Sequence, residues 1–334
     1  MLNNKSILIT GGTGSFGKYF TRMILENFDP ARVIIYSRDE FKQDIMKKEF
    51  THDFPKKSSK LRFFIGDVRD KDRLYRAFDG VDYVIHAAAL KQVPACEYNP
   101  FEAIKTNIHG AQNVVDAALD RNVKKVVALS TDKAVNPINL YGGTKLVSDK
   151  LFVSANAYSG EDGTVFSVVR YGNVTGSRGS VIPFFRELLN DGESVLPITD
   201  TEMTRFWMTL DDAVNLVVKA LEESKGGETY VFKNPSYTVT DVAEALNPGG
   251  EIEIVGIREG EKIHEVMITS DDSRGTYDYG DYYIIYPNFN WWSKERNFKS
   301  GGKNIEKGWE YNSGTNTEWL DVETLRSKID ELGL

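Results

Sequence analysis

Cysteine is almost absent from the chain, because Cys96 stands alone among 334 residues. An intramolecular disulfide is therefore excluded, as are metal sites that need two thiolates. Positive charge is also scarce: 41 lysines and arginines face 49 aspartates and glutamates, which gives a formal net charge of −8. A chain without an overall positive field is not expected to bind nucleic acid or an anionic membrane. We expect a cytoplasmic protein, since disulfides are rare in that compartment.

Long apolar runs are lacking as well. Near the N-terminus the run Ile7–Ile9 is too short for the apolar core of a signal peptide. No stretch approaches the roughly 18 apolar residues that a membrane-spanning helix needs. The four histidines, at positions 52, 86, 109 and 264, do not have the spacing of metal ligands, so no metal site is predicted. His86 is expected to pack inside the protein rather than to react.

Short β-branched segments alternate with helix-length segments through the first half of the chain. The expected strands are Ser6–Thr10, Val33–Ser37, Arg62–Gly66, Tyr83–Ala87, Val126–Ser130 and Phe166–Arg170, and the expected helices are Gly17–Asn27, Glu40–Phe50, Pro100–Arg121 and Leu140–Ser159. The strand segments are continuously apolar, which is typical of strands buried on both faces. We therefore predict an α/β fold, a Rossmann-type doubly wound parallel sheet.

A glycine-rich turn follows the first expected strand. Gly11, Gly14 and Gly17 recur at a spacing of three between this strand and the next helix. Small residues let a pyrophosphate approach the amides at a helix N-terminus, where the helix dipole favours negative charge. We predict dinucleotide binding through Gly11, Thr13, Gly14, Ser15, Phe16 and Gly17. The alternative, a turn kept for tight packing, does not explain the spacing.

The end of the second expected strand favours NADP over NAD. An acidic side chain there would bind the ribose hydroxyls, whereas a basic one meets a 2′-phosphate. The sequence has Ser37 and Arg38 at this point, and Lys42 one turn later is a second candidate contact. Asp39 is expected to cap the next helix. The alternative is that Arg38 and Lys42 are solvated surface charges.

Later strand ends supply further candidate cofactor contacts, because ligands of open sheets bind at the carboxyl ends of the strands. Asp67 and Val68 are expected to flank the adenine, and the small Ala87 and Ala88 to let the cofactor approach. These four residues could instead be plain strand ends.

The regular alternation stops near residue 175. The predicted division is 1–175 with 206–235 for an NADP-binding Rossmann domain, and 176–205 with 236–334 for a smaller, interleaved C-terminal substrate-binding domain. The returning segment is expected to add the helix Asp211–Glu223 and the strand Thr229–Phe232 to the sheet.

Tyr141 and Lys145 form the first candidate catalytic pair. Four residues apart at the start of a helix, they lie on one face, and the preceding strand ends in Ser130 and Thr131. A lysine beside a phenol favours the phenolate, and a cationic nicotinamide adds to this effect. Tyr141 is thus predicted to take a proton from an alcohol as its hydride leaves. The alternative is a core tyrosine beside a surface lysine.

These motifs resemble the extended short-chain dehydrogenase/reductase superfamily. Further segments resemble its inverting UDP-N-acetylglucosamine 4,6-dehydratases of the pseudaminic-acid type: Ser130–Ala134, Asn139–Gly142, Arg170–Val174, Gly176–Val181, Met203–Trp207 and Gly260–Glu265. The resemblance covers about residues 5–270. The aromatic-rich stretch 277–312 has no predicted role.

Asp132 and Lys133 are the second candidate catalytic pair, which a simple dehydrogenase does not need. Once C4 of a hexose is a ketone, the C5 hydrogen is acidic, and water leaves if a base removes that hydrogen while an acid protonates the C6 hydroxyl. Asp132 suits the acid and Lys133 the base, provided that nearby positive charge from Lys145 and the nicotinamide keeps Lys133 neutral. Retaining sugar dehydratases have a glutamate in place of Lys133, so the resemblance implies inversion. The alternative is a salt-bridged turn.

Local cations must hold the substrate diphosphate in this acidic protein. Arg178, Arg205 and Arg258 are the candidates, with Asn173 as an amide donor and Lys91 near the sugar or phosphate. From the resembling segments, Thr131, Tyr141, Val181 and Glu261 are also expected to contact the substrate.

The resemblance implies NADP-dependent 4,6-dehydration of UDP-N-acetylglucosamine with inversion at C5, which gives UDP-2-acetamido-2,6-dideoxy-β-L-arabino-hexos-4-ulose. It also implies a homo-oligomer. One alternative is a UDP-hexose 4-epimerase, which has no use for the Asp132–Lys133 pair. A second is a non-catalytic NADP-sensing protein, a class that can lose the tyrosine and lysine that are intact here.

Overall fold

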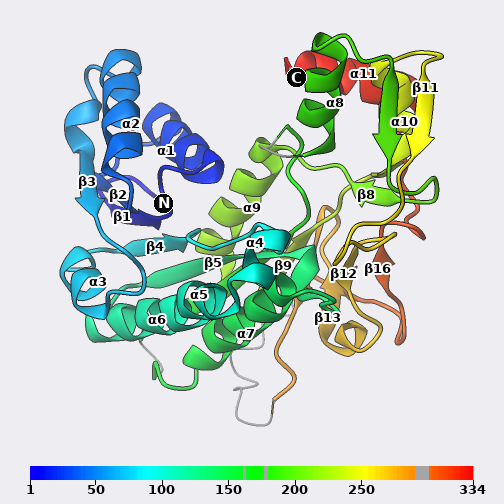
Figure 1. Cartoon of the computed structure of the whole chain (residues 1–334). Coiled ribbons are helices and arrows are strands. Elements are labelled where there is room, and N and C mark those ends of the chain that lie inside the picture. The colour runs from blue at the N-terminus through cyan, green and yellow to red at the C-terminus, as the bar shows by residue number, and fades with distance from the viewer. Residues whose placement is uncertain (161–162, 177–179, 290–300, 334) are drawn as a thin grey trace.

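Ten strands form a central sheet in the residues that the computed structural model describes, 1–160, 163–176, 180–289 and 301–333 (Figure 1). They are β1 (Ser6–Thr10), β2 (Arg32–Ser37), β3 (Leu61–Ile65), β4 (Tyr83–His86), β5 (Lys125–Thr131), β6 (Val165–Tyr171), β9 (Thr229–Phe232), β13 (Thr276–Asp278), β14 (Tyr282–Ile285) and β15 (Lys303–Asn304). Their order is β15-β13-β14-β9-β6-β5-β4-β1-β2-β3. The seven neighbouring strands β9-β6-β5-β4-β1-β2-β3 are parallel. Because β1 lies between β2 and β4, the strand order reverses there, at the switch point where open sheets bind ligands.

Helices cover both faces of this sheet. One face carries α1 (Ser15–Asn27), α2 (Glu40–Asp53) and α9 (Leu210–Glu223), and the other carries α3 (Lys71–Ala77), α6 (Gly110–Asp120) and α7 (Leu140–Ala155) (Figure 1). Ile7 and Ile9 of β1 pack in the core on the first face, and Leu8 packs in the core on the second. The predicted Rossmann-type sheet is confirmed, and the ends of the six predicted strands shift by at most one residue.

The predicted helix Pro100–Arg121 is helical from Pro100 to Asp120, but one π-helical turn interrupts its α-helical geometry. It consists of α5 (Pro100–Ile104), a π-helical turn (Lys105–His109) and α6, and an unpredicted helix, α4 (Val93–Tyr98), precedes it. The π-helical turn makes hydrogen bonds to residues distant in the chain, which are described below, and the sequence pattern of this segment does not predict them.

The other predicted helices differ only at their ends. α1 begins at Ser15 rather than at Gly17, and α2 continues to Asp53. α7 ends at Ala155 because the next side chain, Asn156, turns toward β6, where its Nδ2 donates to Phe166 O and its Oδ1 accepts from Phe166 N.

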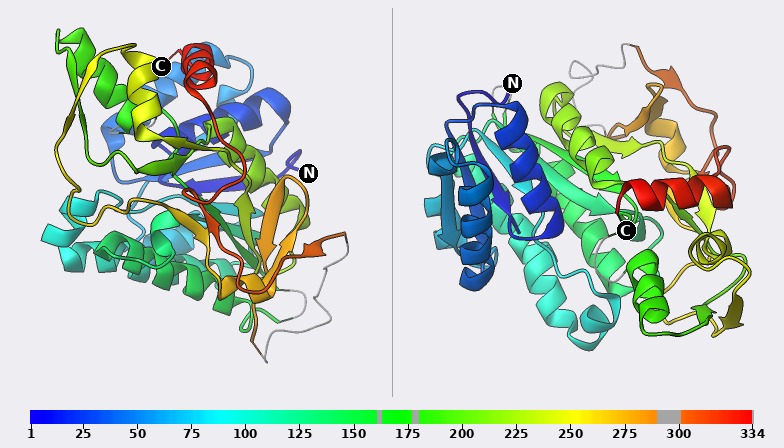
Figure 2. Two further views of the ribbon diagram at one scale, coloured as in Figure 1. Left: turned by 90° about the vertical axis from the view of Figure 1, so that its right-hand side faces the viewer. Right: turned by 90° about the horizontal axis from the view of Figure 1, so that it is seen from above.

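A smaller portion lies beside the sheet (Figure 2). It contains α8 (Val181–Asn190), α10 (Val239–Leu246), α11 (Val322–Glu331), β7 (Val195–Ile198), β8 (Thr204–Phe206), β10 (Ser236–Thr238), β11 (Glu251–Ile254), β12 (Val266–Ile268) and β16 (Tyr311–Asn312). Its strands pair as β10 with β8, β11 with β7 and β12 with β16. Its helices share an apolar core that includes Phe185, Val242 and Leu325.

The division of the chain between these portions differs from the prediction in one respect. The segment 206–235 adds α9 and β9 to the central sheet, where β9 pairs with β6. However, β14 also joins the sheet, antiparallel to β9, and β13 and β15 follow it. Part of the aromatic-rich stretch therefore covers the otherwise open edge of β9, a position that the prediction did not give it, and the substrate-binding role of 236–334 stays a prediction.

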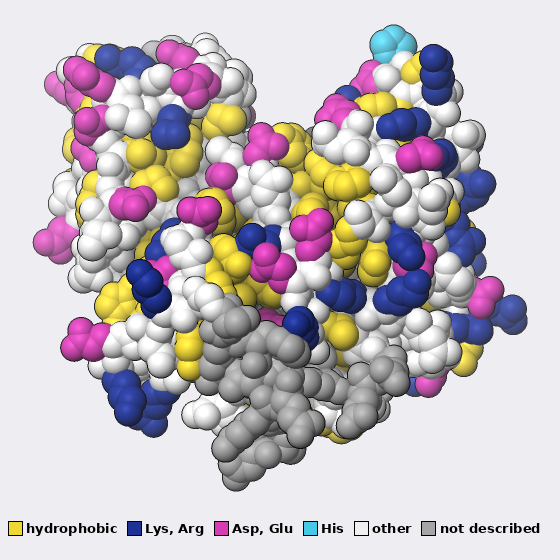
Figure 3. All heavy atoms as spheres, turned by 180° about the vertical axis from the view of Figure 1, so that it is seen from behind, with side chains coloured by type: hydrophobic (Ala, Val, Ile, Leu, Met, Phe, Trp, Pro, Cys, Tyr) yellow, Lys and Arg dark blue, Asp and Glu magenta, His cyan; other side chains and the backbone are white. Residues whose placement is uncertain are grey.

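The surface is hollowed between the part that carries α1 and α2 and the part that carries α8 and α10, as seen from behind in Figure 3. Within the described ranges, none of the helices combines the length and apolar character that a membrane span requires.

Candidate active site

The glycine-rich turn between β1 and α1 presses against the end of β4. Gly11 has φ of 66°, and a Cβ there would lie 2.9 Å from Ala88 N and 3.0 Å from Ala87 C. Position 11 therefore requires glycine. The contact also makes the predicted cofactor contacts of the glycine-rich turn neighbours of those at Ala87 and Ala88. α1 begins at Ser15 without a side-chain cap, so no side chain occupies its first amides. Such a helix N-terminus binds anions. The predicted contacts Thr13, Gly14, Phe16 and Gly17 complete this turn and the start of α1.

Arg38 lies directly after β2, and 54% of its side chain is exposed. Its Nη1 is 3.6 Å from Asp67 Oδ2, just beyond the end of β3, so two predicted cofactor residues contact each other. The side chain of Arg69 also donates to Asp67. Ser37, in contrast, is buried, and its Oγ accepts a hydrogen bond from Gln43 Nε2 at 3.0 Å. Arg38 is thus the accessible member of the predicted phosphate-binding pair.

The residues around Arg38 have structural partners. Asp39 caps α2 by accepting a hydrogen bond from Lys42 N at 2.9 Å, which confirms the predicted cap. The Lys42 ammonium lies 3.3 Å from Asp39 Oδ2 and is largely exposed, the environment of a solvated surface lysine. Val68 is buried, and its carbonyl accepts a hydrogen bond from Asn113 Nδ2.

His86 is a buried packing residue, as predicted. Its Nδ1 lies 2.9 Å from Thr10 Oγ1, and its ring packs against the ring of Phe152. Burial, and then the positive charge of Lys145, lower the pKa of His86 to about 3. The imidazole is therefore neutral at physiological pH.

A buried amide that the sequence analysis did not single out holds the loop after β4. Asn107 lies in the π-helical turn; its Oδ1 accepts from Leu90 N at 2.8 Å, and its Nδ2 donates to Leu90 O at 2.9 Å and to Thr144 Oγ1 at 3.0 Å. These bonds tie the loop that carries Lys91 to α7, the helix that carries Tyr141. π-Helical turns are frequent at functional sites.

Tyr141, Lys145 and Asp149 lie on one buried face of α7. Burial raises the pKa of Tyr141 to about 12, and the positive charge of Lys133 opposes this increase. Burial thus outweighs the charges around the phenol in this structure, and the effect expected of Lys145 together with a bound nicotinamide stays a prediction. Burial also lowers the pKa of Lys145. Asp149, which the sequence analysis missed, accepts a hydrogen bond from Ser130 Oγ.

A close backbone contact brings the second candidate catalytic pair, Asp132 and Lys133, to Tyr141. The 3₁₀ turn Asp132–Ala134 follows β5 and packs on the start of α7, where a Cβ at Gly142 would lie 2.0 Å from Lys133 O. Glycine is thus the residue that permits this approach. Asn139 caps α7 by accepting from Gly142 N, and its Nδ2 donates to Gly260 O at 2.9 Å, which attaches the segment 260–265 to the same place.

The Lys133 ammonium lies among three oxygen acceptors. It donates to Asn173 Oδ1 at 3.0 Å, to Asp132 Oδ1 at 3.2 Å and to Glu265 Oε1 at 3.5 Å. Thr131 Oγ1 donates to the same Asp132 oxygen at 2.7 Å. Burial acts to lower the pKa of Lys133, but the charges of Asp132 and Glu265 outweigh it, so this pKa lies above its ordinary value. Lys133 and Asp132 thus form an ion pair in this structure, the arrangement of the salt-bridged alternative, and a neutral Lys133 beside a bound nicotinamide stays a prediction.

Arg205, predicted to hold the diphosphate, is buried. Its Nη1 donates to Thr204 O at 2.7 Å and to Ile263 O at 3.1 Å, and its Nε lies 3.8 Å from Glu265 Oε1. Because these contacts occupy the guanidinium inside the protein, they favour a structural role over the predicted diphosphate contact.

The other predicted substrate residues lie in different parts of the structure. Asn173 is exposed and contacts Lys133, and Val181 begins α8. Lys91 and Arg258 are exposed, and Arg258 N donates to Glu261 Oε2 at 3.3 Å. Arg178 lies outside the described residues.

Comparison with known proteins places these residues in a family. The family described as polysaccharide biosynthesis protein matches residues 7–287. The chain belongs to this family. The chain is 54% identical over 335 residues to a UDP-N-acetylglucosamine 4,6-dehydratase (inverting) of Campylobacter jejuni, an alignment that covers 99% of this chain and 98% of that protein. The resemblance to the inverting dehydratases is thereby confirmed.

The chain is also similar to a relative with another name. A UDP-glucose 4-epimerase of Rickettsia canadensis is 42% identical over 336 residues, which cover 98% of this chain and 96% of that protein. Among solved structures, Pen from Bacillus thuringiensis has a TM-score of 0.88 and 37% identity and covers 100% of this chain and 99% of its own. DesIV, a dTDP-glucose 4,6-dehydratase from Streptomyces venezuelae, has a TM-score of 0.64 at 24% identity over 77% of this chain and 86% of its own, which supports the fold alone.

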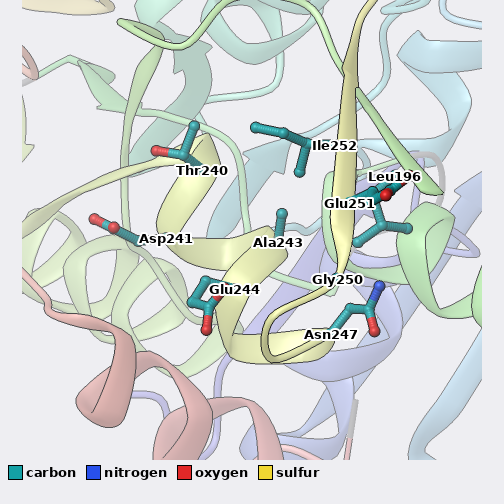
Figure 4. Close-up of a pocket in the computed structure, with 9 residues that line it drawn as sticks. All are labelled: Leu196, Thr240, Asp241, Ala243, Glu244, Asn247, Gly250, Glu251 and Ile252. Atoms are coloured by element: carbon teal, nitrogen blue, oxygen red, sulfur yellow. The ribbon is translucent and has the colours of Figure 1, made fainter. Parts of the chain in front are cut away.

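The structure also contains a cavity of about 250 Å³, which none of the predicted cofactor-binding, substrate-binding or catalytic residues of this chain lines (Figure 4). It lies between β7, α10 and β11 and is lined by Leu196, Thr240, Asp241, Ala243, Glu244, Asn247, Gly250, Glu251 and Ile252. Its three carboxylates would repel a diphosphate, so the cavity does not suit a UDP-sugar.

Glu265 is, with Asn107 and Asp149, one of the candidates that sequence reasoning missed. It belongs to the resembling segment Gly260–Glu265, from which only Glu261 was chosen. The signal that could have found it is weak, since Glu265 meets Lys133 only through the fold.

Proposed function

We propose that this protein is an NADP-dependent, inverting UDP-N-acetylglucosamine 4,6-dehydratase. The observation that carries the proposal is the contact between Asp132 and Lys133 beside Tyr141, which puts an acid and a base next to an oxidation site. An epimerase oxidises and reduces C4 and has no use for this pair. The identity to the Campylobacter jejuni enzyme supports the same substrate.

The residues present fit a dinucleotide. The Gly11 turn leaves room for backbone approach, and the uncapped N-terminus of α1 suits a pyrophosphate. Gly11–Gly17 would hold the pyrophosphate, Asp67 and Val68 the adenosine, and Arg38 the 2′-phosphate that distinguishes NADP from NAD. When bound, the nicotinamide takes up the C4 hydride and returns it to C6.

Tyr141 removes the proton from the C4 hydroxyl. Its phenol must first ionise, and its pKa of about 12 shows that burial opposes this. The positive charge of Lys133 favours the phenolate, as does any further cation at the site. Lys145, buried one turn further along α7, adds a hydrogen-bond donor to the same face.

The elimination begins inside the Asp132–Lys133 pair. A proton that moves from Lys133 Nζ to Asp132 across their 3.2 Å contact leaves a neutral amine and a protonated carboxyl. The amine then takes the C5 proton, the C5–C6 double bond forms, and Asp132 gives its proton to the C6 hydroxyl, which departs as water. Both residues regain their charges. Inversion then requires that C5 receives a proton on the opposite face.

Product analysis tests the proposal. Purified protein incubated with UDP-N-acetylglucosamine is expected to form the L-arabino 4-keto-6-deoxy sugar nucleotide, identified by NMR within the first turnovers. The Rickettsia canadensis relative makes the epimerase the second candidate. An epimeric C4 alcohol without a ketone would establish that function, and the absence of any product would favour the NADP-sensing protein.

A further inference from the structure

Glu265 is a buried carboxylate with incomplete pairing. It is 3% exposed, its Oε1 lies 3.5 Å from Lys133 Nζ and 3.8 Å from Arg205 Nε, and its Oε2 has no hydrogen-bond partner among the described residues. A buried charge costs free energy unless ion pairs and hydrogen bonds compensate it. A partly satisfied carboxylate beside a catalytic lysine therefore calls for a functional explanation.

Its position complements that of Asp132. The two carboxylates and the Asn173 amide supply one acceptor for each of the three N–H groups of the Lys133 ammonium. Arg205 in turn holds Glu265 by its charge, and its own Nη1 is fixed by the carbonyls of Thr204 and Ile263. These three acceptors fix the orientation of the Lys133 ammonium, and the carboxylates of Asp132 and Glu265 balance its charge.

We propose that Glu265 is a positioning residue for the elimination step: it holds the Lys133 ammonium against Asp132 and keeps the proton on that pair until the C4 ketone has formed. It acts through Lys133 and does not take part in C4 oxidation. This inference rests on the dehydratase function proposed above. The titratable and charged groups that face Lys133 are Asp132, Glu265, Arg205, Tyr141, Tyr237 and Lys262.

The variant Glu265→Gln removes the charge and keeps the size. Transient reduction of the bound cofactor on mixing with UDP-N-acetylglucosamine should stay within about threefold of wild type, while steady-state turnover falls about 100-fold, the scale of a lost acid–base contribution. The pH at which turnover declines on the alkaline side should move down by about one unit, because Lys133 loses a neighbouring negative charge and the pair loses its proton earlier. Lost packing alone would slow cofactor reduction and elimination together, and it would not move the alkaline limb of the pH profile of turnover.

Glu228→Gln is the matched control. Glu228 is equally buried and accepts hydrogen bonds from Lys225 N and Gly226 N in a turn before β9. Its replacement should lower the unfolding temperature without moving the alkaline limb. An unchanged limb in Glu265→Gln, or equal slowing of oxidation and elimination, would overturn the inference.

If Glu265→Gln does not fold, Glu265→Asp serves as the test. The shorter side chain keeps the charge but lengthens the contact to Lys133, so turnover should fall about tenfold with cofactor reduction retained. Wild-type turnover in Glu265→Asp would contradict the inference. A wild-type enzyme that forms no ketone would instead refute the dehydratase function, so the two failures are distinguishable.

Discussion

Arg38 Nη1 lies 3.6 Å from Asp67 Oδ2, so the residue expected to bind a 2′-phosphate is paired with a carboxylate at the end of the neighbouring strand. A phosphate would compete with this exposed pair and would form stronger, paired hydrogen bonds with the guanidinium. Arg38→Ala should therefore weaken NADP by about 10- to 100-fold and NAD by much less, measured by titration of the purified protein with each cofactor.

A neighbouring lysine provides the control for this prediction. Lys48, on α2, is exposed and pairs with Asp44, so Lys48→Ala removes a positive charge from the helix that follows Arg38. Affinity for both cofactors should be unchanged in this variant. Equal losses of NADP and NAD affinity in Arg38→Ala would show that Arg38 does not read the 2′-phosphate.

Tyr141→Phe should bind substrate with the wild-type dissociation constant but show no transient cofactor reduction. The variant keeps the buried ring and removes only the hydroxyl that takes the proton from O4. Stopped-flow absorbance of the reduced nicotinamide measures the step. Turnover within about tenfold of wild type, a loss of only ~1.4 kcal/mol of transition-state stabilisation, would exclude this role for Tyr141.

Lys133→Ala should separate the two halves of the reaction in the opposite way. C4 oxidation should persist at a reduced rate, because Tyr141 loses the positive charge that favours its phenolate. The 4-keto intermediate with reduced cofactor should still accumulate, because no amine removes the C5 proton. In wild type, turnover in heavy water should place deuterium at C5, because inversion gives C5 a new proton on the opposite face while the proton taken by Lys133 exchanges with solvent. A deuterium label at C4 should appear at C6, because a hydride carried on nicotinamide does not exchange. A D-xylo product from the first turnovers would refute the inversion.

His86 should make the protein less stable as the pH falls. In the unfolded chain a histidine gains its proton below about pH 6.5, whereas His86 in the folded protein stays neutral down to about 3. Between these values the unfolded state binds one more proton, so His86 lowers the free energy of unfolding by up to about 1.4 kcal/mol per pH unit. Urea unfolding of wild type and His86→Gln across this range should give a shallower pH dependence in the variant. His52→Gln, which changes a 90% exposed side chain, should keep the wild-type slope.

The sheet could be predicted because its signals are local. Continuous apolar runs such as Ile7–Ile9 require burial on both faces. The glycines after β1 each permit a close backbone contact, Gly11 with the residues after β4 and Gly17 with Gly12. The spacing of Tyr141 and Lys145 likewise needs only a helix. What followed from the sequence alone was thus the set of elements and the chemistry of neighbouring residues.

Features that depend on distant residues were not predictable in this way. The charge of Asp132 raises the pKa of Lys133 most, but Glu265, 132 positions later in the chain, also raises it, and no local pattern predicts that contact. The aromatic-rich stretch joins the sheet because β14 pairs with β9, and the pattern of Tyr282–Ile285 does not identify that partner. The break within Pro100–Arg121 depends on hydrogen bonds to Leu90.

The π-helical turn Lys105–His109 restricts the number of residues that this part of the chain can contain. Each residue of an α-helix advances the chain by about 100° around the axis, and a π-helical turn contains one residue more than an α-helical turn. Deleting a single residue there would let α5 and α6 fuse into a regular helix and would rotate Asn107 away from Leu90 and Thr144. Functional relatives should therefore tolerate substitutions along this helix far better than single-residue deletions within it.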